Sequence, residues 1–400
     1  MDSLATANFL LSDQAAPALE WLTPLDFTPA DVPRLLAALR KDFSAEESLA
    51  LLSLAQQRRQ AGSRLEGAEQ WFFIDQADQQ ASSTLAARHR AEKLDRLAGP
   101  GAIVELGCGI GADTVELARL RQVIAFEKDE ARLAMARANC QRLGLEVDFR
   151  LGDWLSQELP TAAAAYLDPS RRREGRRRLR PQDWDPPLNL ALEQLRGLPT
   201  VVKAAPGIRD PELPPNCQVE FIGFERTCPE AVLWCGFGLS GRLASVHTRS
   251  GWVEVEGQPG AAPTGPLEGM GYLFEPEPAL VRARALTGLC RQLEAHLVDA
   301  DIAYLVGPRP AQGELFSTFA IEAVLPAREK ALRAELRKRE IGQLEIKKRG
   351  VELDPDQFRK RLKPSGPNQG VLLVFRKGRG RLAVLARRAG KTPGPANGPA

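Results

Sequence analysis

The sequence predicts an α/β protein built on a doubly wound, mostly parallel sheet. A short apolar run, Ala102–Leu106, leads directly into three closely spaced glycines and then into helix-compatible residues. A second apolar run, Val123–Phe126, ends at the acidic Glu127. Apolar strand patterns then alternate with helical stretches as far as about residue 240. Strands that alternate with helices are typical of βαβ units, so these three observations favour a parallel sheet covered by helices.

The residues before this pattern are predicted to form a helical segment. Apolar residues recur at helical intervals in residues 31–40 and again in residues 45–59. The aromatic run Trp71-Phe72-Phe73 follows, and a further helix is expected to end near Arg96. We expect the three aromatic side chains to pack in the core rather than to line a ligand pocket.

The glycines Gly107, Gly109 and Gly111 are spaced as G-x-G-x-G. A side chain at such a strand-to-helix turn would keep the backbone away from a bound nucleoside, and the turn can require positive φ. Dinucleotide-binding domains and S-adenosylmethionine (SAM) domains both fit this frame. The spacing differs from the G-x-G-x-x-G that seats a pyrophosphate on a helix N-terminus. Glu105, inside the first strand, also suits a ligand with an ammonium group better than one with phosphates.

Two more acidic residues follow predicted strands. Glu127 ends the second strand, where α/β nucleoside sites accept hydrogen bonds from ribose hydroxyls. Asp153 comes shortly after the third strand, Val147–Leu151. Because the carboxyl ends of parallel strands meet at one edge of the sheet, both acids are expected to face the same ligand as the glycines.

Residues 104–111, Val-Glu-Leu-Gly-Cys-Gly-Ile-Gly, resemble motif I of the class I SAM-dependent methyltransferases. The resemblance implies a Rossmann-like, seven-stranded core in which the glycine loop holds the methionine portion of the cofactor. It further implies that Glu127 holds the ribose and that Asp153 hydrogen-bonds the adenine. Glu105 matches the acidic position of motif I. The whole chain is similar to a bacterial subfamily in which this core, with a Leu-Asp-Pro-x-Arg-Arg motif, is followed by a THUMP-like domain.

This resemblance and the patterns of the chain divide it into five predicted parts. The later part has small α+β domains, and its last domain is expected to run as a strand, a helix, a basic turn at 345–350, a second helix and a hairpin. The predicted parts are a helical N-terminal segment at 1–94, the methyltransferase core at 95–240, a small α/β (ferredoxin-like) subdomain at 241–312, a basic THUMP-like domain at 313–388 and a disordered tail at 389–400.

The fourth predicted strand, Ala163–Leu167, ends in Asp168-Pro169-Ser170-Arg171. Reactive groups gather at the carboxyl ends of strands in open α/β sheets, so Asp168 is expected to orient the nucleophile and accept its proton. In amino-methylating relatives the equivalent motif is Asp/Asn-Pro-Pro-aromatic, which implies that the acid and the carbonyl of Pro169 aim the target nitrogen. Ser170 and Arg171 depart from that motif. An exocyclic amine, a ring nitrogen and a carbon therefore all remain open as methyl acceptors.

An arginine-rich stretch follows this strand directly. Seven of the ten residues from Arg171 to Arg180 are arginine. Guanidinium groups grip phosphates with their fork geometry, so Arg171 and Arg172 are predicted to contact nucleic acid. Trp184 could stack on a base or pack in the core. Lys203, at the end of the fifth strand, is a weaker candidate for the same rim.

The net charge of +3 conceals a strong polarity along the chain. From residue 326 onward there are 20 Lys and Arg against 7 Asp and Glu, whereas the remainder holds 34 against 44. A basic module is typical of a polyanion binder. The resemblance to THUMP modules implies RNA contacts for Lys347, Lys348 and Arg349, although electrostatics alone does not separate RNA from other polyanions.

Several classes of protein are disfavoured by the sequence. No run of eighteen apolar residues exists, and the start lacks the pattern of a signal peptide, so a cytoplasmic protein without a membrane span is expected. The six cysteines are scattered without paired Cys or His spacing, which indicates reduced thiols and no metal site. The three histidines form no Ser/His/Asp pattern, so a hydrolase is disfavoured.

The sequence therefore predicts a SAM-dependent methyltransferase acting on a base in structured RNA, tRNA or rRNA. Two alternatives remain open from the residues. The first is an RNA-binding protein whose Rossmann-like half is catalytically silent, suggested by the altered Asp-Pro-Ser-Arg motif. The second is a protein methyltransferase that uses the same cofactor. A nicotinamide-dependent enzyme is disfavoured by the glycine spacing.

Overall fold

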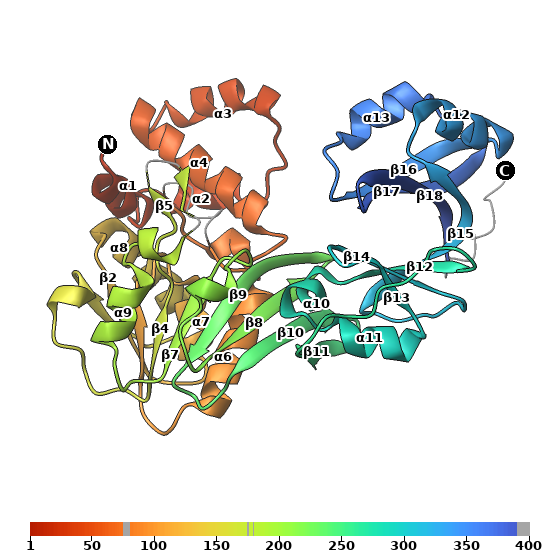
Figure 1. The fold of residues 1–400 in the computed structure, drawn as a ribbon. Helices are drawn as coiled ribbons and strands as arrows, with labels where there is room; N and C mark the ends of the chain where they lie inside the picture. Colours follow the sequence, from red (N-terminus) through yellow and green to blue (C-terminus); the bar gives the residue numbers. More distant parts are fainter. Residues whose placement is uncertain (75–80, 174–175, 179, 390–400) are drawn as a thin grey trace. The chain divides into compact units, whose positions relative to one another are not determined.

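The computed structural model describes residues 1–74, 81–173, 176–178 and 180–389 (Figure 1). The chain divides into two compact units. The first unit holds residues 1–218 and 232–240, and the second holds residues 219–231 together with those from 241 onward. The tail that was expected to be disordered lies outside the described residues, apart from Ala389.

The first unit begins with the helical segment that the sequence predicts. The longest of its helices, α4, starts at a capping box in which Ser44 and Glu47 satisfy each other's backbone N–H groups. Trp71, Phe72 and Phe73 pack in the same core as these helices and are at most 5% exposed, so they are core residues as predicted. The helices are α1 (Ser3–Leu10), α2 (Ala16–Leu22), α3 (Val32–Leu39), α4 (Ala45–Ala61) and α6 (Thr84–Leu97).

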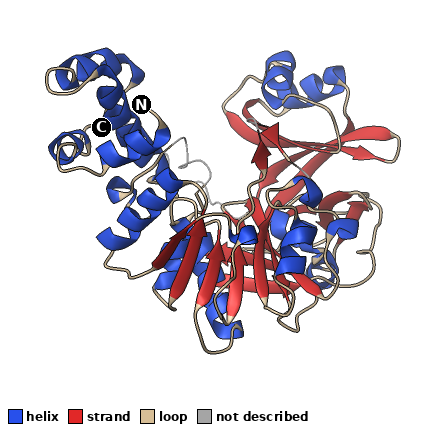
Figure 2. Cartoon of the chain, turned by 90° about the vertical axis from the view of Figure 1, so that its left-hand side faces the viewer, coloured by secondary structure: helices blue, strands red, loops and turns tan. Residues whose placement is uncertain are grey.

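A parallel sheet forms the centre of the first unit, with its strands in the order β7-β4-β1-β2-β3. Each strand is short and β1, β2, β4 and β7 are buried throughout, as expected of strands covered on both faces. The strands are β1 (Ile103–Leu106), β2 (Val123–Glu127), β3 (Asp148–Leu151), β4 (Ala164–Leu167) and β7 (Thr200–Ala204). The helices between them are α7 (Ala112–Ala118), α8 (Glu130–Arg142) and α9 (Leu188–Gln194) (Figure 2).

The register of this sheet brings three strand ends to one level. Leu106, the last residue of β1, lies opposite Phe126 of β2 and Leu167 of β4. Because β1 continues to β2 on one side and pairs with β4 on the other, the chain order reverses at this point. Ligands of open α/β sheets bind at such a switch point, beyond the carboxyl ends of the strands.

The last predicted core strands form a hairpin. They are β8 (Cys217–Phe224) and β9 (Thr227–Cys235), joined by Glu225 and Arg226, whose positive φ values of 50° and 61° suit a tight two-residue turn. The reversed last pair that the sequence predicts is therefore present. Within the second unit two further strands extend the sheet beyond β8, namely β10 (Gly241–Thr248) and β11 (Gly251–Glu256).

The rest of the second unit is built on a seven-stranded sheet in the order β13-β14-β12-β15-β18-β17-β16. It joins strands from the predicted ferredoxin-like subdomain and from the predicted THUMP-like domain. The strands are β12 (Tyr272–Pro276), β13 (His296–Asp299), β14 (Ile302–Gly307), β15 (Phe316–Pro326), β16 (Ile341–Arg349), β17 (Asn368–Lys377) and β18 (Gly380–Arg388). The helices are α10 (Pro278–Ala283), α11 (Leu286–Leu293), α12 (Glu329–Lys338) and α13 (Pro355–Leu362).

One sequence prediction in this unit is wrong. The basic stretch expected to be a turn is the end of strand β16, which pairs in parallel with β17. Leu344 and Ile346 are buried against α12 and α13, while Glu345 between them and Lys347 after them point to the other face. Three consecutive cations, Lys347, Lys348 and Arg349, follow Ile346 in this strand, and they concealed the period of two that marks a half-buried strand.

None of the described helices is long and apolar enough to cross a membrane.

Candidate active site

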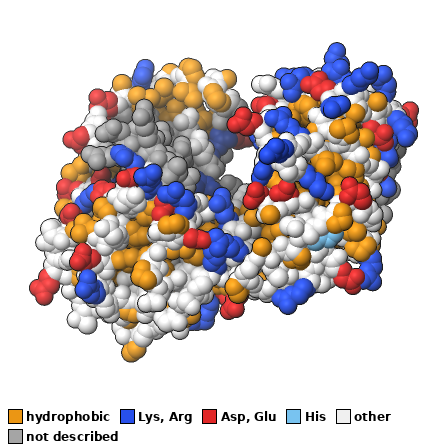
Figure 3. All heavy atoms as spheres, in the orientation of Figure 1, with side chains coloured by type: hydrophobic (Ala, Val, Ile, Leu, Met, Phe, Trp, Pro, Cys, Tyr) orange, Lys and Arg blue, Asp and Glu red, His pale blue; other side chains and the backbone are white. Residues whose placement is uncertain are grey.

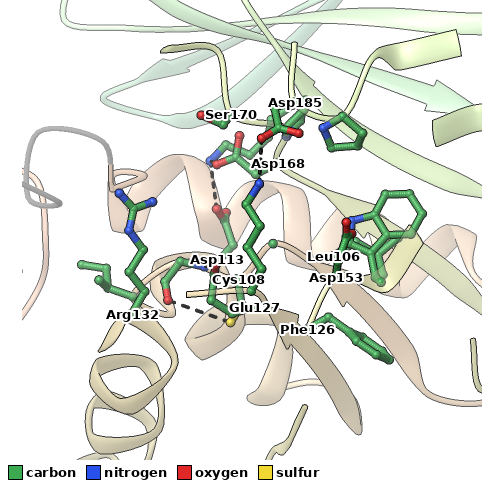
Figure 4. A pocket seen from close by; sticks show the side chains of 18 of the residues that line it. Leu106, Cys108, Asp113, Phe126, Glu127, Arg132, Asp153, Asp168, Ser170 and Asp185 are labelled. Atoms are coloured by element: carbon green, nitrogen blue, oxygen red, sulfur yellow. Dashed lines mark hydrogen bonds and ion pairs between the residues drawn. The ribbon is translucent and has the colours of Figure 1, made fainter. Parts of the chain in front are cut away.

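A cavity of about 390 Å³ opens at the carboxyl ends of the strands in the first unit. Its lining includes the glycine loop after β1, the acidic residues after β2 and β3, and the Asp168 loop after β4. Figure 4 shows Phe126 and Asp153 together on one side of this cavity and Asp113 and Asp168 away from them (Figure 4). The structure therefore brings most of the predicted site residues into one pocket.

The glycine loop has the backbone that the sequence predicts. Gly107 and Gly111 adopt φ values of +85° and +88°, a region that residues with a side chain rarely enter. A Cβ atom on Gly111 would lie 3.3 Å from Ala136 of α8, tighter than ordinary contact. Gly107 and Gly109 line the pocket, so the loop offers bare backbone to a ligand.

Glu127 is fixed by the loop that it faces. Its Oε2 accepts a hydrogen bond of 2.8 Å from the backbone N–H of Gly109, and its Oε1 accepts one of 3.0 Å from Asp129. The side chain is buried yet lines the pocket. A carboxylate offers about four acceptor positions, so Glu127 retains capacity for hydroxyl groups of a ligand.

The other end of the pocket combines an apolar wall with an acid. Phe126 and Trp154 are buried and line the pocket. Asp153 lies beside them, exposed, and its Oδ1 accepts a hydrogen bond of 3.1 Å from the backbone N–H of Leu155. Aromatic rings next to a polar acceptor suit a flat heterocycle with an amino group.

Glu105 takes a different place from the other predicted residues. It is 2% exposed within β1 and is absent from the pocket lining. Its Oε2 has no hydrogen-bond partner among the described residues. Burial raises the pKa of Glu105 to about 8, so its carboxyl group keeps a proton at neutral pH. Glu105 therefore lies within β1 outside the pocket lining, and its predicted contact with the cofactor stays a prediction.

A buried charge network lies beneath the pocket and centres on Asp113 of α7. Asp113 accepts hydrogen bonds from Arg90 (2.5 Å), Ser82 (2.7 Å), Tyr166 (2.8 Å) and Lys203 (3.0 Å). Burial alone would raise the pKa of Asp113, but the two cations outweigh it and hold that pKa far below its ordinary value. The carboxylate is therefore ionised and fixed on every side.

Lys203 connects this network to the pocket. Its Nζ contacts the carboxylate of Asp168 and also donates to Ser82 Oγ at 2.7 Å. The Lys203 side chain is 4% exposed, whereas that of Asp168 is 30% exposed. Asp168 thus presents one side to the pocket while a buried ammonium group holds its other side. Together with Asp113 and Arg90, the four charges balance to zero, which is what buried ionic groups require.

The loop after Asp168 is held by backbone hydrogen bonds. Ser170 and Asp185 exchange two of them, at 2.8 and 2.9 Å, and the Asp185 side chain contacts Lys128 at 2.7 Å. Pro169 is buried and, with Arg171, lines the pocket.

The sequence also predicts an RNA contact for Arg172 and either base stacking or core packing for Trp184. Arg172 lies in the short strand β5 (Arg172–Arg173), which pairs with β6 (Arg176–Arg177), and its side chain lies outside the described part of the structure. Trp184 is 2% exposed and therefore packs in the core.

The predicted RNA-contact residues Lys347, Lys348 and Arg349 belong to the second unit. Lys347 pairs with Glu275 at 2.6 Å, and Arg349 lies 3.7 Å from the same carboxylate. Lys348 donates a hydrogen bond of 2.6 Å to the backbone carbonyl of Leu353. All three cations are therefore engaged within the unit.

Sequence reasoning missed most of the buried network. No sequence pattern singles out Ser82, Arg90, Asp113 or Tyr166, and of this network the sequence predicts only Asp168 and Lys203 as site residues. The available signal was a polar residue inside an otherwise apolar element, such as Lys203 in Thr200–Ala204. Such residues are buried only when paired, so each one points to a partner elsewhere in the chain.

Two family models match separate parts of the chain: a methyltransferase domain at residues 103–167 and a THUMP-like domain at residues 316–388. Uncharacterized S-adenosylmethionine-dependent methyltransferases of two Mycobacterium tuberculosis strains, CDC 1551 and H37Rv, are 36% identical over 337 residues, which is 79% of this chain and 88% of theirs. A crystal structure of a candidate methyltransferase from Porphyromonas gingivalis W83 matches with a TM-score of 0.67. It covers 91% of this chain and 100% of that one at 16% identity, so it supports the fold alone.

Proposed function

Because the chain belongs to the S-adenosylmethionine-dependent methyltransferases, we propose that it methylates a base in a structured RNA, tRNA or rRNA, in the cytoplasm. The THUMP-like domain supports an RNA substrate. So does the surplus of cations from residue 326 onward, because phosphate contacts supply much of the affinity of RNA-binding proteins. The catalytic part of the proposal is carried by one observation, the carboxylate of Asp168 held at the pocket by the buried Lys203.

The pocket suits S-adenosylmethionine in shape and chemistry. Gly107 and Gly109 leave backbone free for its methionine portion, and Glu127 has acceptor capacity for its ribose hydroxyls. The aromatic wall and Asp153 at the other end suit adenine. When bound, this cofactor supplies a methyl group on a positively charged sulfur.

In the proposed mechanism, Asp168 and the carbonyl oxygen of Pro169 accept hydrogen bonds from the target group of the base. These contacts aim its lone pair at the methyl group, and Asp168 then accepts the displaced proton. Alignment of two reactants supplies a large share of the rate enhancement for such a transfer. Lys203 prevents the Asp168 side chain from rotating away, and Arg171 at the pocket lining is suited to a neighbouring phosphate.

The proposal is tested with labelled S-adenosylmethionine and RNA from cells that lack this protein. The wild-type protein is expected to label one RNA band after separation by size. Asp168→Ala should lower the transfer at least about 100-fold, in the range of positioned acid–base groups, while calorimetry shows nearly unchanged cofactor binding. Asp183→Ala, which removes an exposed acid on the following loop that is not part of the pocket lining, serves as the matched control and should keep full activity.

The outcomes separate this function from its rivals. Label in protein instead of RNA would favour a protein methyltransferase. Cofactor binding with no label in any cellular RNA or protein would favour a catalytically silent RNA-binding protein. Full activity of the Asp168→Ala protein would remove Asp168 from the mechanism.

A further inference from the structure

The two helices of the THUMP-like region carry a group of exposed cations, called here the helical face. Residues 328–339 and 355–363, which include both helices, hold ten Lys and Arg against three Asp and Glu. Six of these cations are exposed and make no side-chain hydrogen bond or ion pair with any described residue; besides Arg328, which precedes α12, five of them lie on the helices or at a helix end. They are Lys330, Arg337 and Lys338 on α12, Lys360 on α13, and Lys363 at its C-cap.

Packing of the helices fixes the direction of this face. Leu332 and Leu336 of α12, and Phe358 and Leu362 of α13, are buried against the sheet. The positions about half a turn away, which include the four cations within the helices, therefore point outward, and Lys363 at the C-cap of α13 is exposed as well. Figure 3 shows blue Lys and Arg side chains gathered over these helices (Figure 3).

Side-chain contacts between the helices hold them side by side. Arg333 of α12 donates a hydrogen bond of 2.9 Å to the backbone carbonyl of Arg361 in α13. Arg361 in turn pairs with Glu329 at 3.2 Å. Asp356, an acid on the exposed side of α13, is paired with Arg359 at 2.8 Å. These contacts fix the two helices to each other, and Glu329 and Asp356 are already paired with arginines.

Two cations of strand β16 differ in both respects, and the third, Lys348, is exposed but donates a hydrogen bond to the backbone carbonyl of Leu353. Lys347 and Arg349 are 24% and 23% exposed and share the carboxylate of Glu275. A phosphate that approached them would have to compete with that carboxylate at close range. The five cations of the helical face lose only water when a phosphate binds, so their charge is fully available to a polyanion.

We infer that the helical face binds the phosphates of the RNA, an inference that rests on the proposed function. Its cations supply charge but no pattern of base-reading donors and acceptors, so the contact positions RNA without reading its sequence. Strand β16, with Lys347, Lys348 and Arg349, then has a structural role within the sheet. In this division of roles, the residues of the pocket described above recognise the target base.

The test compares two sets of substitutions in the full-length protein. The helical set is Lys330→Gln, Arg337→Gln, Lys338→Gln, Lys360→Gln and Lys363→Gln, and the strand set is Lys347→Gln, Lys348→Gln and Arg349→Gln. Unfractionated tRNA is a suitable probe because phosphate contacts do not depend on sequence. Its dissociation constant is measured over a range of NaCl concentrations, and thermal melting shows that each protein is folded.

The helical set should bind tRNA at least about tenfold more weakly at low salt and should flatten the salt dependence. Each phosphate contact adds about 0.7–0.9 to the slope of log affinity against log salt, so five lost contacts should lower the slope by about 3.5–4.5. The strand set should change the slope by less than about 1. In methyl transfer to RNA, the helical set should raise KM and leave kcat unchanged.

Two results would overturn the inference, and they differ in what else they remove. If the strand set flattens the salt dependence and the helical set does not, the face is wrong while the RNA substrate stands. If the wild-type protein binds tRNA weakly and without a steep salt dependence, the RNA substrate of the proposed function fails together with the face.

Discussion

The two units each hold a dense group of charged side chains, and the groups differ in their access to water. In the network of the first unit, the side chains of Arg90, Asp113 and Lys203 are 0%, 9% and 4% exposed. In the helical face of the second unit, even the paired charges are accessible. The Arg359 and Asp356 side chains, for example, are 40% and 79% exposed.

This difference in burial assigns different tasks to the same residue types. Buried charges tolerate little movement, because an ion that loses its partner in a dry interior costs several kcal/mol. Such a network is suited to holding a reacting carboxylate in one position. Exposed pairs contribute little to stability and exchange readily with water and salt. Such a surface is suited to a partner that binds through many weak, salt-dependent contacts.

Removal of a buried charge partner from the network of the first unit should lower the stability of the protein strongly. Asp113→Asn keeps the size of the side chain but leaves Arg90 and Lys203 with a neutral neighbour. We expect the free energy of unfolding to fall by about 3–5 kcal/mol, the usual cost of breaking a buried pair. Urea denaturation followed by circular dichroism measures this loss.

Asp356→Asn makes the same chemical change in the second group and is the matched control. It removes the partner of the exposed Arg359 and should cost at most about 1 kcal/mol. Comparable losses in the two variants would mean that burial does not distinguish the two groups, and the comparison would fail.

Lys203→Met tests the role of the buried network in catalysis. The change keeps the length of the side chain and leaves Asp113 paired with Arg90, but Asp168 loses its cation. A reacting group displaced by about 1 Å can cost about 100-fold in rate, so we expect kcat to fall by about that factor. The KM for RNA and the affinity for the cofactor should stay within about threefold.

A purely structural role of Lys203 predicts another pattern. The variant would then melt at a lower temperature, but kcat of the folded fraction would equal that of the wild-type protein. Steady-state kinetics at a temperature well below the melting transition separates the two roles.

The sequence predicted the features of this fold that depend on local patterns. The glycine loop, Glu127 and Asp153 are found at strand ends, and parallel strands bring their ends together, so their convergence in one pocket follows from the order of elements. The network around Asp113 could not be predicted in this way. Its members come from positions 82, 90, 113, 166 and 203, and only the folded chain makes them neighbours.

The basic residues of β16 illustrate the same limit at the surface. The sequence shows Lys347-Lys348-Arg349 as a free cluster because its counter-charge, Glu275, lies more than seventy positions earlier. A charge run indicates where cations are but not which of them are already paired.

Glu105 allows the smallest and most specific test of the comparison, because it is a buried acid without an ion pair to any described residue, whereas Asp113 is paired with Arg90 and Lys203. Its pKa in the folded protein is about 8, against an ordinary value of 4.5. Between these values the folded state binds more protons than the unfolded state, so the free energy of unfolding falls as pH rises, by up to about 1.4 kcal/mol per unit. Glu105→Gln cannot ionise and should lack this slope.

Urea denaturation of both proteins between pH 5 and pH 9 measures this effect, since the difference between the two curves cancels the other titrating groups. The two proteins should have their most similar stabilities near pH 5, and the variant should gain on the wild-type protein as pH rises toward 8. A constant difference across this range would mean that Glu105 is ionised in the folded state. Its burial would then have to be balanced by a charge partner, and the contrast with Asp113 would disappear.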